Sequence, residues 1–339
     1  MNESNAALNP VRIADTDRLL SIDNLQVHFP VREGIIFDKT VGQIKAVDGV
    51  SFDIHRGETL GLVGESGCGK TTIGRCLLKL ETPTAGKIHY RGRDIASLET
   101  TDLADYRRQV QAVFQDPFSS LNPRMSVGDI VTEPLIIHEK NVNFVERAHK
   151  LKDLLNICGL PTNLADRYPH EMSGGQRQRV GIARALALRP EFIVCDEAVS
   201  ALDVSIQAQI IRLLEDLREE FGLTYLFIGH DLSVVRHLCH RVAVMYLGKI
   251  VEVGQCDDIF HNAMHPYTQA LLTAVPVPDP EKERQRSHEY IGGEIPSPRN
   301  PPPGCVFHPR CRIAEQQCKT QIPMPRDFPD GRKVSCHLC

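Results

Sequence analysis

The stretch Gly64-Glu65-Ser66-Gly67-Cys68-Gly69-Lys70-Thr71-Thr72 follows a short apolar run, Thr59–Val63, and precedes a helical pattern over Thr71–Leu80. Its glycines let backbone N–H groups converge on phosphate oxygens without a Cβ in the way, and the helix N-terminus adds partial positive charge. Lys70 supplies a point charge for the β- and γ-phosphates, and Thr71 offers a hydroxyl to Mg²⁺. A strand, this loop and a helix in succession predict a phosphate-binding loop in an α/β fold.

Strand and helix patterns alternate along much of the chain. Val204–Phe221 carries apolar residues on one helical stripe, and a helix capped by Ser173 is expected to run through Ala187. This alternation predicts a mainly parallel sheet with helices on both faces. Strands are expected at Leu19–Phe29, Ala46–Ile54, Lys87–Tyr90, Gln111–Phe114, Phe192–Cys195, Thr224–Ile228 and Val242–Tyr246, with Pro30–Ile44 as a loop insertion.

The remaining segments suggest a division of the chain into parts. Residues 1–18 lack apolar periodicity and predict a flexible arm, and 19–262 form the main domain. Within it, residues of about 117–170 turn helical, with breaks expected at Pro123, Pro134 and Pro161. Residues 263–339 form a C-terminal extension, which from about Pro276 reads as a separate, loop-dominated appendage.

Composition excludes several classes of protein. The 339 residues hold 39 Lys and Arg against 43 Asp and Glu, so the net charge of −4 gives no global basic field for nucleic acid. The chain shows neither a long apolar run for a spanning helix nor a signal-peptide pattern at its polar start. We therefore expect a cytosolic protein whose cysteines are mostly reduced and whose membrane association comes through a partner.

Two adjacent carboxylates, Asp196 and Glu197, end the strand Phe192–Cys195. Asp196 suits the outer shell of Mg²⁺, and Glu197 suits a general base that polarises an attacking water. Two acids at a strand end could also be solvated charges. Their position after a phosphate-binding loop in the same sheet favours the catalytic interpretation.

These motifs, in this order, resemble those of an ATP-binding cassette (ABC) ATPase over roughly residues 19–255. The resemblance implies a P-loop NTPase core sheet, an antiparallel β subdomain and a helical subdomain, with ATP and Mg²⁺ bound. It also implies that Gln115 senses Mg²⁺, water and the membrane partner, and that His230 contacts the γ-phosphate and orients the water. The signature, which would grip the γ-phosphate on a partner subunit, is Ser173, Gly174, Gly175 and Gln176; the loop that links the two sites is Ser200, Ala201, Leu202 and Asp203.

Since the signature acts in trans, we expect a dimer that closes on ATP and opens after hydrolysis. The aromatic residue that stacks on adenine is expected before the second strand, where the insertion at 30–44 falls. Phe37 is the candidate and Phe29 the alternative. Either could instead be an ordinary core or loop phenylalanine. Two positions depart from the family pattern: Ala198 replaces a usual proline, and Gly229 stands where Ala or Ser is commoner. Neither removes a functional group.

Further stretches are similar to the oligopeptide/dipeptide importers. They are Gln115–Arg124, Asp203–Ile210, Val244–Ile250, His265–Thr268 and the region from Gly304 to His337. The match spans nearly the whole chain and is greatest to the F-type ATP-binding subunit. Such subunits form a heterodimer with a D-type paralogue at the cytoplasmic side of the membrane, under two membrane subunits fed by an extracellular binding protein.

Five cysteines crowd the last 35 positions: Cys305, Cys311, Cys318, Cys336 and Cys339. A reduced, proline-rich tail buries little apolar surface, and thiolate ligation is one way to order it. The resemblance suggests a four-iron, four-sulfur cluster on the first four. Zinc with His308 or His337 as a substitute ligand, or free thiols without metal, are the alternatives.

The leading functional prediction is ATP hydrolysis that drives import of di- or oligopeptides. The same machine could carry nickel, glutathione or oligosaccharides, because cargo contacts lie in other chains. A cassette ATPase acting on ribosomes or nucleic acid is a different class, but it usually carries a long coiled-coil insertion or a second cassette. Export is disfavoured by the extended Gln loop and the cysteine tail.

Overall fold

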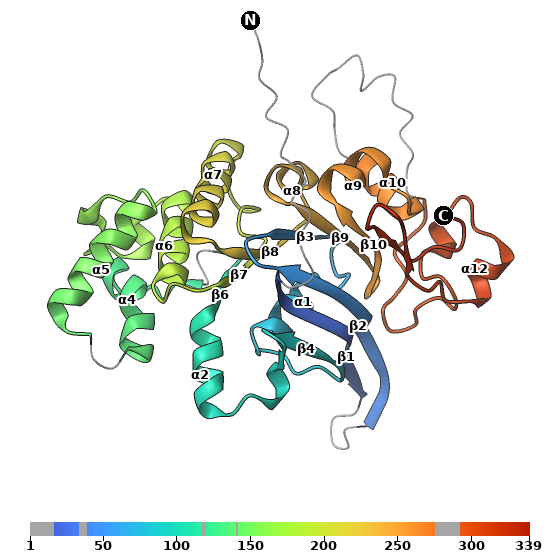
Figure 1. Ribbon diagram of the computed structural model, residues 1–339, viewed down its shortest axis with the longest axis horizontal. Helices are drawn as coiled ribbons and strands as arrows, with labels where there is room; N and C mark the ends of the chain where they lie inside the picture. The colour runs from blue at the N-terminus through green and yellow to red at the C-terminus, as the bar shows by residue number, and fades with distance from the viewer. Residues whose placement is uncertain (1–16, 34–38, 117–119, 140–141, 275–291) are drawn as a thin grey trace, which may run out of the picture.

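The computed structural model describes residues 17–33, 39–116, 120–139, 142–274 and 292–339. Within these ranges the strands pair into one eight-stranded and one four-stranded sheet. Figure 1 shows helices on both sides of the larger sheet, as the sequence predicted. None of the described helices is long and apolar enough to span a bilayer.

The larger sheet has the order β11-β12-β10-β9-β3-β8-β7-β6. Its five strands from β9 to β6 pair in parallel, whereas β10, β12 and β11 are antiparallel additions at one edge. The mainly parallel core is therefore confirmed. The strands are β3 (Thr59–Val63), β6 (Val110–Val113), β7 (Phe192–Asp196), β8 (Thr224–Gly229), β9 (Arg241–Tyr246), β10 (Lys249–Gln255), β11 (Arg326–Asp327) and β12 (Lys333–Val334).

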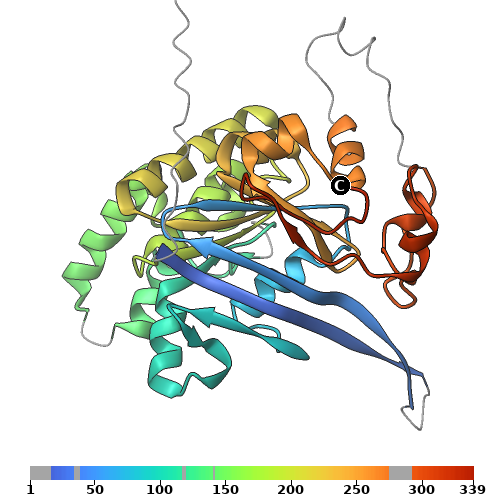
Figure 2. The same cartoon turned by 45° about the vertical axis from the view of Figure 1, so that its right-hand side comes forward.

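The smaller sheet is antiparallel and lies beneath the larger one (Figure 2), with the order β2-β1-β4-β5. The two faces of the larger sheet border different cores, because side chains alternate along a strand. On β8, Leu226 and Ile228 join the core between the sheets, while Tyr225 and Phe227 join the core under the helices. The strands of the smaller sheet are β1 (Arg18–Glu33), β2 (Lys39–His55), β4 (Ala85–Tyr90) and β5 (Arg93–Asp94).

The predicted loop over Pro30–Ile44 is wrong for most of its length. β1 continues to Glu33 and β2 begins at Lys39, and the ladder between them includes the pair Pro30↔Gln43. Pro30 lacks an N–H, but β4 pairs with β1 only from Leu20 to Gln26, so at Pro30 the strand has β2 as its only partner within the described residues. Prolines are tolerated at such edge positions of a sheet.

Helices α4, α5 and α6 gather at the left of Figure 1 and pack on one another. Pro134 lies inside α4 and does not end it, contrary to the predicted break. Ile130, Val131 and Leu135 are buried, and this packing holds the helix on both sides of the proline. The helices are α1 (Lys70–Leu77), α2 (Thr100–Gln109), α4 (Val127–His138), α5 (Phe144–Ile157), α6 (Gly174–Leu186), α7 (Val204–Phe221), α8 (Leu232–Leu238), α9 (Cys256–Asn262), α10 (Pro266–Thr273) and α12 (Gln316–Thr320), with short 3₁₀ turns at Ile95–Ser97, Thr162–Leu164, Pro169–Glu171 and His308–Arg310.

The C-terminal segment joins the core rather than standing apart from it. β12 pairs with β10 through Glu252↔Val334, and both figures show the red segment beside β10. The buried carboxylate of Glu252 accepts the N–H groups of Met264 (2.8 Å) and His265 (3.0 Å). This carboxylate satisfies backbone donors that lead into α10, and so ties the start of the extension to the sheet.

His265 should make the folding stability depend on pH. Its Nδ1 accepts the N–H of Tyr267 at 3.0 Å, and burial lowers its pKa to about 4. An unfolded histidine titrates near 6.5. The stabilisation that comes from burying the neutral His265 ring is therefore fully present above pH 6.5, declines as the pH falls, and is lost once the pH has passed about 4.

The variant His265→Asn keeps a capping acceptor that does not titrate. We expect the free energy of unfolding, measured with urea, to fall between pH 7 and pH 4 by on the order of 2–3 kcal/mol more for the native chain than for this variant. Parallel pH profiles for the two proteins would show that His265 does not titrate in this way.

Candidate nucleotide site

The phosphate-binding loop connects β3 to α1 and lies against backbone from two other segments. A Cβ on Gly64 (φ 153°) would lie 2.1 Å from the carbonyl oxygen of Met245. A Cβ on Gly69 (φ 109°) would lie 2.1 Å from the carbonyl oxygen of Ala46. Only glycine fits at either position, so the loop keeps its backbone N–H groups free of side-chain cover at the start of α1.

Lys70 lies within this loop, with only 5% of its surface exposed. Its Nζ donates to the carbonyl oxygens of Gly64 (2.8 Å) and Glu65 (3.0 Å) and lies 3.7 Å from Cys68 Sγ. Among the residues that the structure places, no carboxylate pairs with this ammonium. A buried positive charge held by neutral groups suits an anionic ligand such as a phosphate.

Two oxygen groups that suit Mg²⁺ lie together: the Thr71 hydroxyl, a predicted ligand, and the Asp196 carboxylate, which was predicted for the outer shell of the ion. Thr71 Oγ1 lies 3.1 Å from Asp196 Oδ1, although the two residues are 125 positions apart in the chain. Burial raises the pKa of Asp196, the hydrogen bond from Thr71 opposes that effect, and the charge of Glu197 adds to it. A hydroxyl beside a carboxylate fits a hard divalent cation, which would also offset the cost of burying that charge.

Three predicted catalytic side chains meet at one carboxylate oxygen. Gln115 Nε2 donates to Glu197 Oε2 at 2.7 Å, and His230 Nδ1 lies 3.4 Å from the same atom. Gln115 follows β6, Glu197 follows β7 and His230 follows β8, so the order of parallel strands brings them to one edge of the sheet. The structure thus brings these three predicted site residues together.

Glu197 also has a left-handed backbone conformation, with φ 47°. Its N–H donates to Ile228 O at 2.9 Å, and its carbonyl accepts from the Ser200 N–H (3.1 Å) and hydroxyl (3.0 Å). Such backbone conformations cost roughly 1–3 kcal/mol and persist where the surroundings impose them. Glu197 thus has this strained backbone conformation at the position where its side chain meets Gln115 and His230.

A small cavity of about 60 Å³ is lined by Glu197, Ser200 and His230, among others. It has room for a water molecule beside the carboxylate.

The two positions that depart from the family pattern both favour a small side chain. A Cβ on Gly229 would approach Phe227 Cε1 to 3.1 Å. Ala198 is buried, which also favours a small side chain.

The signature residues form the N-terminus of α6. Ser173 Oγ accepts the Gln176 N–H at 3.3 Å, and Gln176 Oε1 accepts the Ser173 N–H at 3.0 Å. This capping box begins the helix, with Ser173 as the predicted N-cap. A Cβ on Gly175 would lie 2.6 Å from Ile206 Cγ2, so glycine lets α6 approach α7. α6 lies with α4 and α5 at the left of Figure 1, whereas α1 lies near its centre.

The linking loop lies between Glu197 and the signature. Ser200 bonds to the Glu197 carbonyl, and a Cβ on Gly174 would lie 3.4 Å from Leu202 Cδ2. Ala201 is exposed. Asp203 caps α7 by accepting the Ile206 N–H at 3.0 Å, and this bond lowers the pKa of its carboxyl. The loop therefore touches both motifs within one chain.

The other loop residues differ in their surroundings. Ser66 and Gly67 are exposed, Cys68 is buried, and Thr72 is half-buried on α1. Phe37 lies outside the described residues. Phe29 packs against the core between the two sheets, as a structural phenylalanine would. The identity of the adenine-stacking residue stays a prediction.

Sequence reasoning missed two residues that contact the phosphate-binding loop. Tyr267 Oη accepts the Glu65 N–H at 3.0 Å, and Arg310 forms an ion pair with the Glu65 carboxylate. Tyr267 stood in a stretch noted only for its family likeness. Arg310 is 245 positions from Glu65, and no local pattern connects the two.

The predicted ligand set of the cysteine tail does not fit a metal in this arrangement. Within the described ranges, no group of three or more His, Cys, Asp or Glu side chains could hold a metal ion. The prediction of a cluster on Cys305, Cys311, Cys318 and Cys336, or of zinc with His308 or His337, is therefore not supported.

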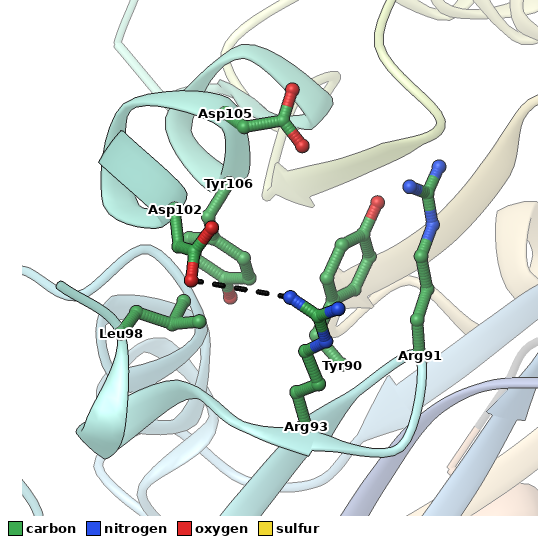
Figure 3. A pocket seen from close by; sticks show the side chains of 7 residues that line it. All are labelled: Tyr90, Arg91, Arg93, Leu98, Asp102, Asp105 and Tyr106. Atoms are coloured by element: carbon green, nitrogen blue, oxygen red, sulfur yellow. Dashed lines mark ion pairs between the residues drawn. The ribbon is translucent and has the colours of Figure 1, made fainter. Parts of the chain in front are cut away.

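A separate hollow of about 370 Å³ opens beside β4 and α2 (Figure 3). Most of its polar side chains already have partners in the protein. Tyr90 donates to Glu191 at 2.6 Å, Tyr106 donates to the Leu77 carbonyl, and Arg93 lies 3.9 Å from Asp102. Paired groups of this kind offer little to a ligand, so the loop at α1 remains the candidate site.

Comparison with known proteins agrees with this geometry. Residues 47–200 match the family model described as ABC transporter, and residues 251–318 match that described as Oligopeptide/dipeptide transporter, C-terminal region. The oligopeptide transport ATP-binding protein AppF of Bacillus subtilis is 52% identical over 326 residues, which cover 96% of this chain and 98% of that protein. The oligopeptide transport ATP-binding protein OppF of Salmonella typhimurium is 50% identical, with 90% and 92% covered.

A solved structure shows the same fold. The ATP-binding cassette MJ0796, a dimer in a post-hydrolysis state bound to ADP and Pi, has a TM-score of 0.62 and 29% identity. The match covers 70% of this chain and 99% of that one. Taken with the full-length likeness to the curated relatives, it shows that this chain belongs to the ATP-binding proteins of the ABC transporter family.

Proposed function

We infer that the chain hydrolyses ATP and thereby powers the import of di- or oligopeptides through an ABC transporter. The observation that carries this inference is the convergence of Gln115 and His230 on Glu197, directly beside the Thr71–Asp196 pair. The peptide cargo is supported by the names of the relatives and by the C-terminal region they share with this chain.

The residues of the site divide the chemistry of phosphoryl transfer between them. Lys70 and the loop N–H groups bind the phosphates, and His230 stands where it can contact the terminal one. Glu197 accepts the proton of the attacking water, which Gln115 helps to orient. Thr71 and Asp196 would hold Mg²⁺, which neutralises phosphate charge when bound.

Dimerisation completes the site in this proposal. The signature at α6 lies apart from its own chain's loop, which supports a composite site with a partner cassette. A paralogous ATPase subunit is the proposed partner, as in the peptide-importer group. The division into an arm (1–18), a cassette (19–262) with a helical part near 117–170, and an extension (263–339) belongs to the same proposal.

Exposed apolar side chains on α4 and α5 support a membrane-subunit contact. Ile136, Ile137, Phe144 and Val145 are all exposed, Phe144 to 74%. Such a group is unusual on a free surface and suits a protein partner. We propose that one of the transporter's two membrane subunits docks here, which would place the chain on the cytoplasmic face of the membrane, with an extracellular binding protein delivering cargo.

Copurification separates transport from the other class of cassette ATPase. A tagged chain, purified from mild-detergent membranes of its own cells, should retain two hydrophobic membrane subunits and a second cassette. The variant Phe144→Glu, which places a charge on the exposed α5 surface, should lose the membrane subunits. Retention of ribosomes or DNA instead would contradict the transport function.

A further inference from the structure

The C-terminal segment contacts one residue of the phosphate-binding loop, Glu65, at two places. Its carboxylate forms two bonds with the guanidinium of Arg310, of 2.8 and 3.0 Å. Its N–H donates to Tyr267 Oη at 3.0 Å. The carbonyl oxygen of the same residue accepts from Lys70 Nζ at 3.0 Å. Glu65 therefore connects the extension directly to the lysine that would bind phosphate.

Arg310 is fixed in place for this contact. Its side chain is only 5% exposed, and its guanidinium lies 5.7 Å from the centroid of the Tyr246 ring. It also bonds to Tyr246 Oη (3.3 Å) and to the Gly292 carbonyl (3.3 Å). A planar, bidentate pair with further bonds on the cation loses little rotamer freedom when it forms.

An aromatic cluster holds the supporting residues in register. The ring of Tyr267 lies 4.7 Å from that of Tyr246 and 5.3 Å from that of Phe307, which is itself buried. Tyr246 ends β9, Tyr267 lies in α10 and Phe307 precedes Arg310. The sheet, α10 and the tail thus meet behind Glu65, and the position of Arg310 is set by packing rather than by a mobile surface.

We propose that Arg310 is a positioning residue for ATP: it anchors Glu65 so that the loop is arranged for phosphate, and it neutralises a carboxylate beside the triphosphate site. The proposal rests on the ATP-binding function inferred above. Two effects follow from losing the guanidinium. The fraction of loops in the binding-competent arrangement falls, and the unpaired Glu65 charge repels the phosphates.

The two effects predict a specific pattern among three variants of the full chain. Arg310→Ala should raise the Kd for a fluorescent ATP analogue about tenfold, and Glu65→Gln about two- to threefold. The double variant should bind about as well as Glu65→Gln alone, because the carboxylate that Arg310→Ala leaves unpaired is gone. The Arg310→Ala defect should also shrink as salt is raised, since repulsion is screened.

Steady-state kinetics provides the second readout. For Arg310→Ala, KM for ATP should rise about tenfold while kcat at saturating ATP stays within about twofold of the native value. Lys319→Ala removes an exposed cation from the same extension and should leave Kd, KM and kcat unchanged. A residue that merely holds the tail in place would lower the melting temperature without this pattern.

The outcomes separate this inference from the proposed function. If the native chain binds the analogue and Arg310→Ala binds it equally well, the positioning role is overturned and the ATPase function stands. Additive losses in the double variant would also overturn it, because Glu65 and Arg310 would then act independently. A native chain that binds no nucleotide would contradict the function and this inference together.

Discussion

Replacing Glu197 by Gln is expected to slow ATP turnover about 10²–10⁴-fold, or by about 3–5 kcal/mol of barrier, while ATP binding persists. The amide keeps the size of the side chain and can still bond to Gln115, but it cannot accept a proton from water. Single-turnover hydrolysis and binding of a labelled ATP, measured on the same preparation, separate the two steps.

The matched control for this change is Glu220→Gln, which neutralises an exposed acid on α7 and should leave turnover unchanged. Near-normal hydrolysis by Glu197→Gln would remove Glu197 from the role of base. A loss of ATP binding as large as the loss of turnover would instead assign it to ligand binding.

Replacing Lys70 by Ala is expected to weaken ATP binding about 30–300-fold, or by about 2–3.4 kcal/mol. The ammonium is buried and bonded to neutral loop atoms, so its removal takes away the charge that a triphosphate would meet there. Equilibrium titration with a fluorescent ATP analogue measures the change directly.

Lys87→Ala is the control, because it removes an exposed lysine from β4 and so changes the net charge by the same amount. ATP affinity should be unaltered in that variant. If Lys70→Ala binds ATP as tightly as the native chain, the loop at α1 is not the phosphate site.

The parts of the structure that the sequence could predict are those determined by neighbouring residues in the chain. α7 begins at Val204 and ends at Phe221 as expected, because Asp203 caps it, apolar residues recur on one stripe, and Gly222 ends it with a φ of 65°. The grouping of Glu197 and His230 was likewise predictable, because ends of parallel strands meet at one edge of a sheet.

Features that depend on contacts between distant segments could not be predicted in this way. β1 extends to Glu33 and β2 begins at Lys39 because the two strands pair with each other, and at Pro30 β1 pairs with β2 but not with β4. α4 passes through Pro134 because its neighbours bury its apolar side chains. Neither condition is visible in a local window.

The C-terminal segment also depends on contacts between distant residues that the sequence does not predict. The family resemblance suggested a cluster on four of the tail's cysteines, but the sequence does not determine whether their side chains converge, and within the described residues they form no metal-binding group. Conversely, Arg310 carries no local signal, yet its guanidinium forms a two-bond contact with Glu65 in the phosphate-binding loop. The tail's connection to the ATP site comes from the pairing of β12 with β10 and from the aromatic cluster behind Glu65.

The most direct test of the central claim is uptake of a labelled dipeptide and a labelled pentapeptide by cells whose only copy of this chain carries Glu197→Gln. We expect uptake of one or both peptides to collapse while uptake of unrelated amino acids persists, and the length of the affected peptide assigns the cargo class. Unchanged uptake of both peptides, in cells without a second peptide importer, would contradict peptide import and direct attention to nickel, glutathione or oligosaccharides.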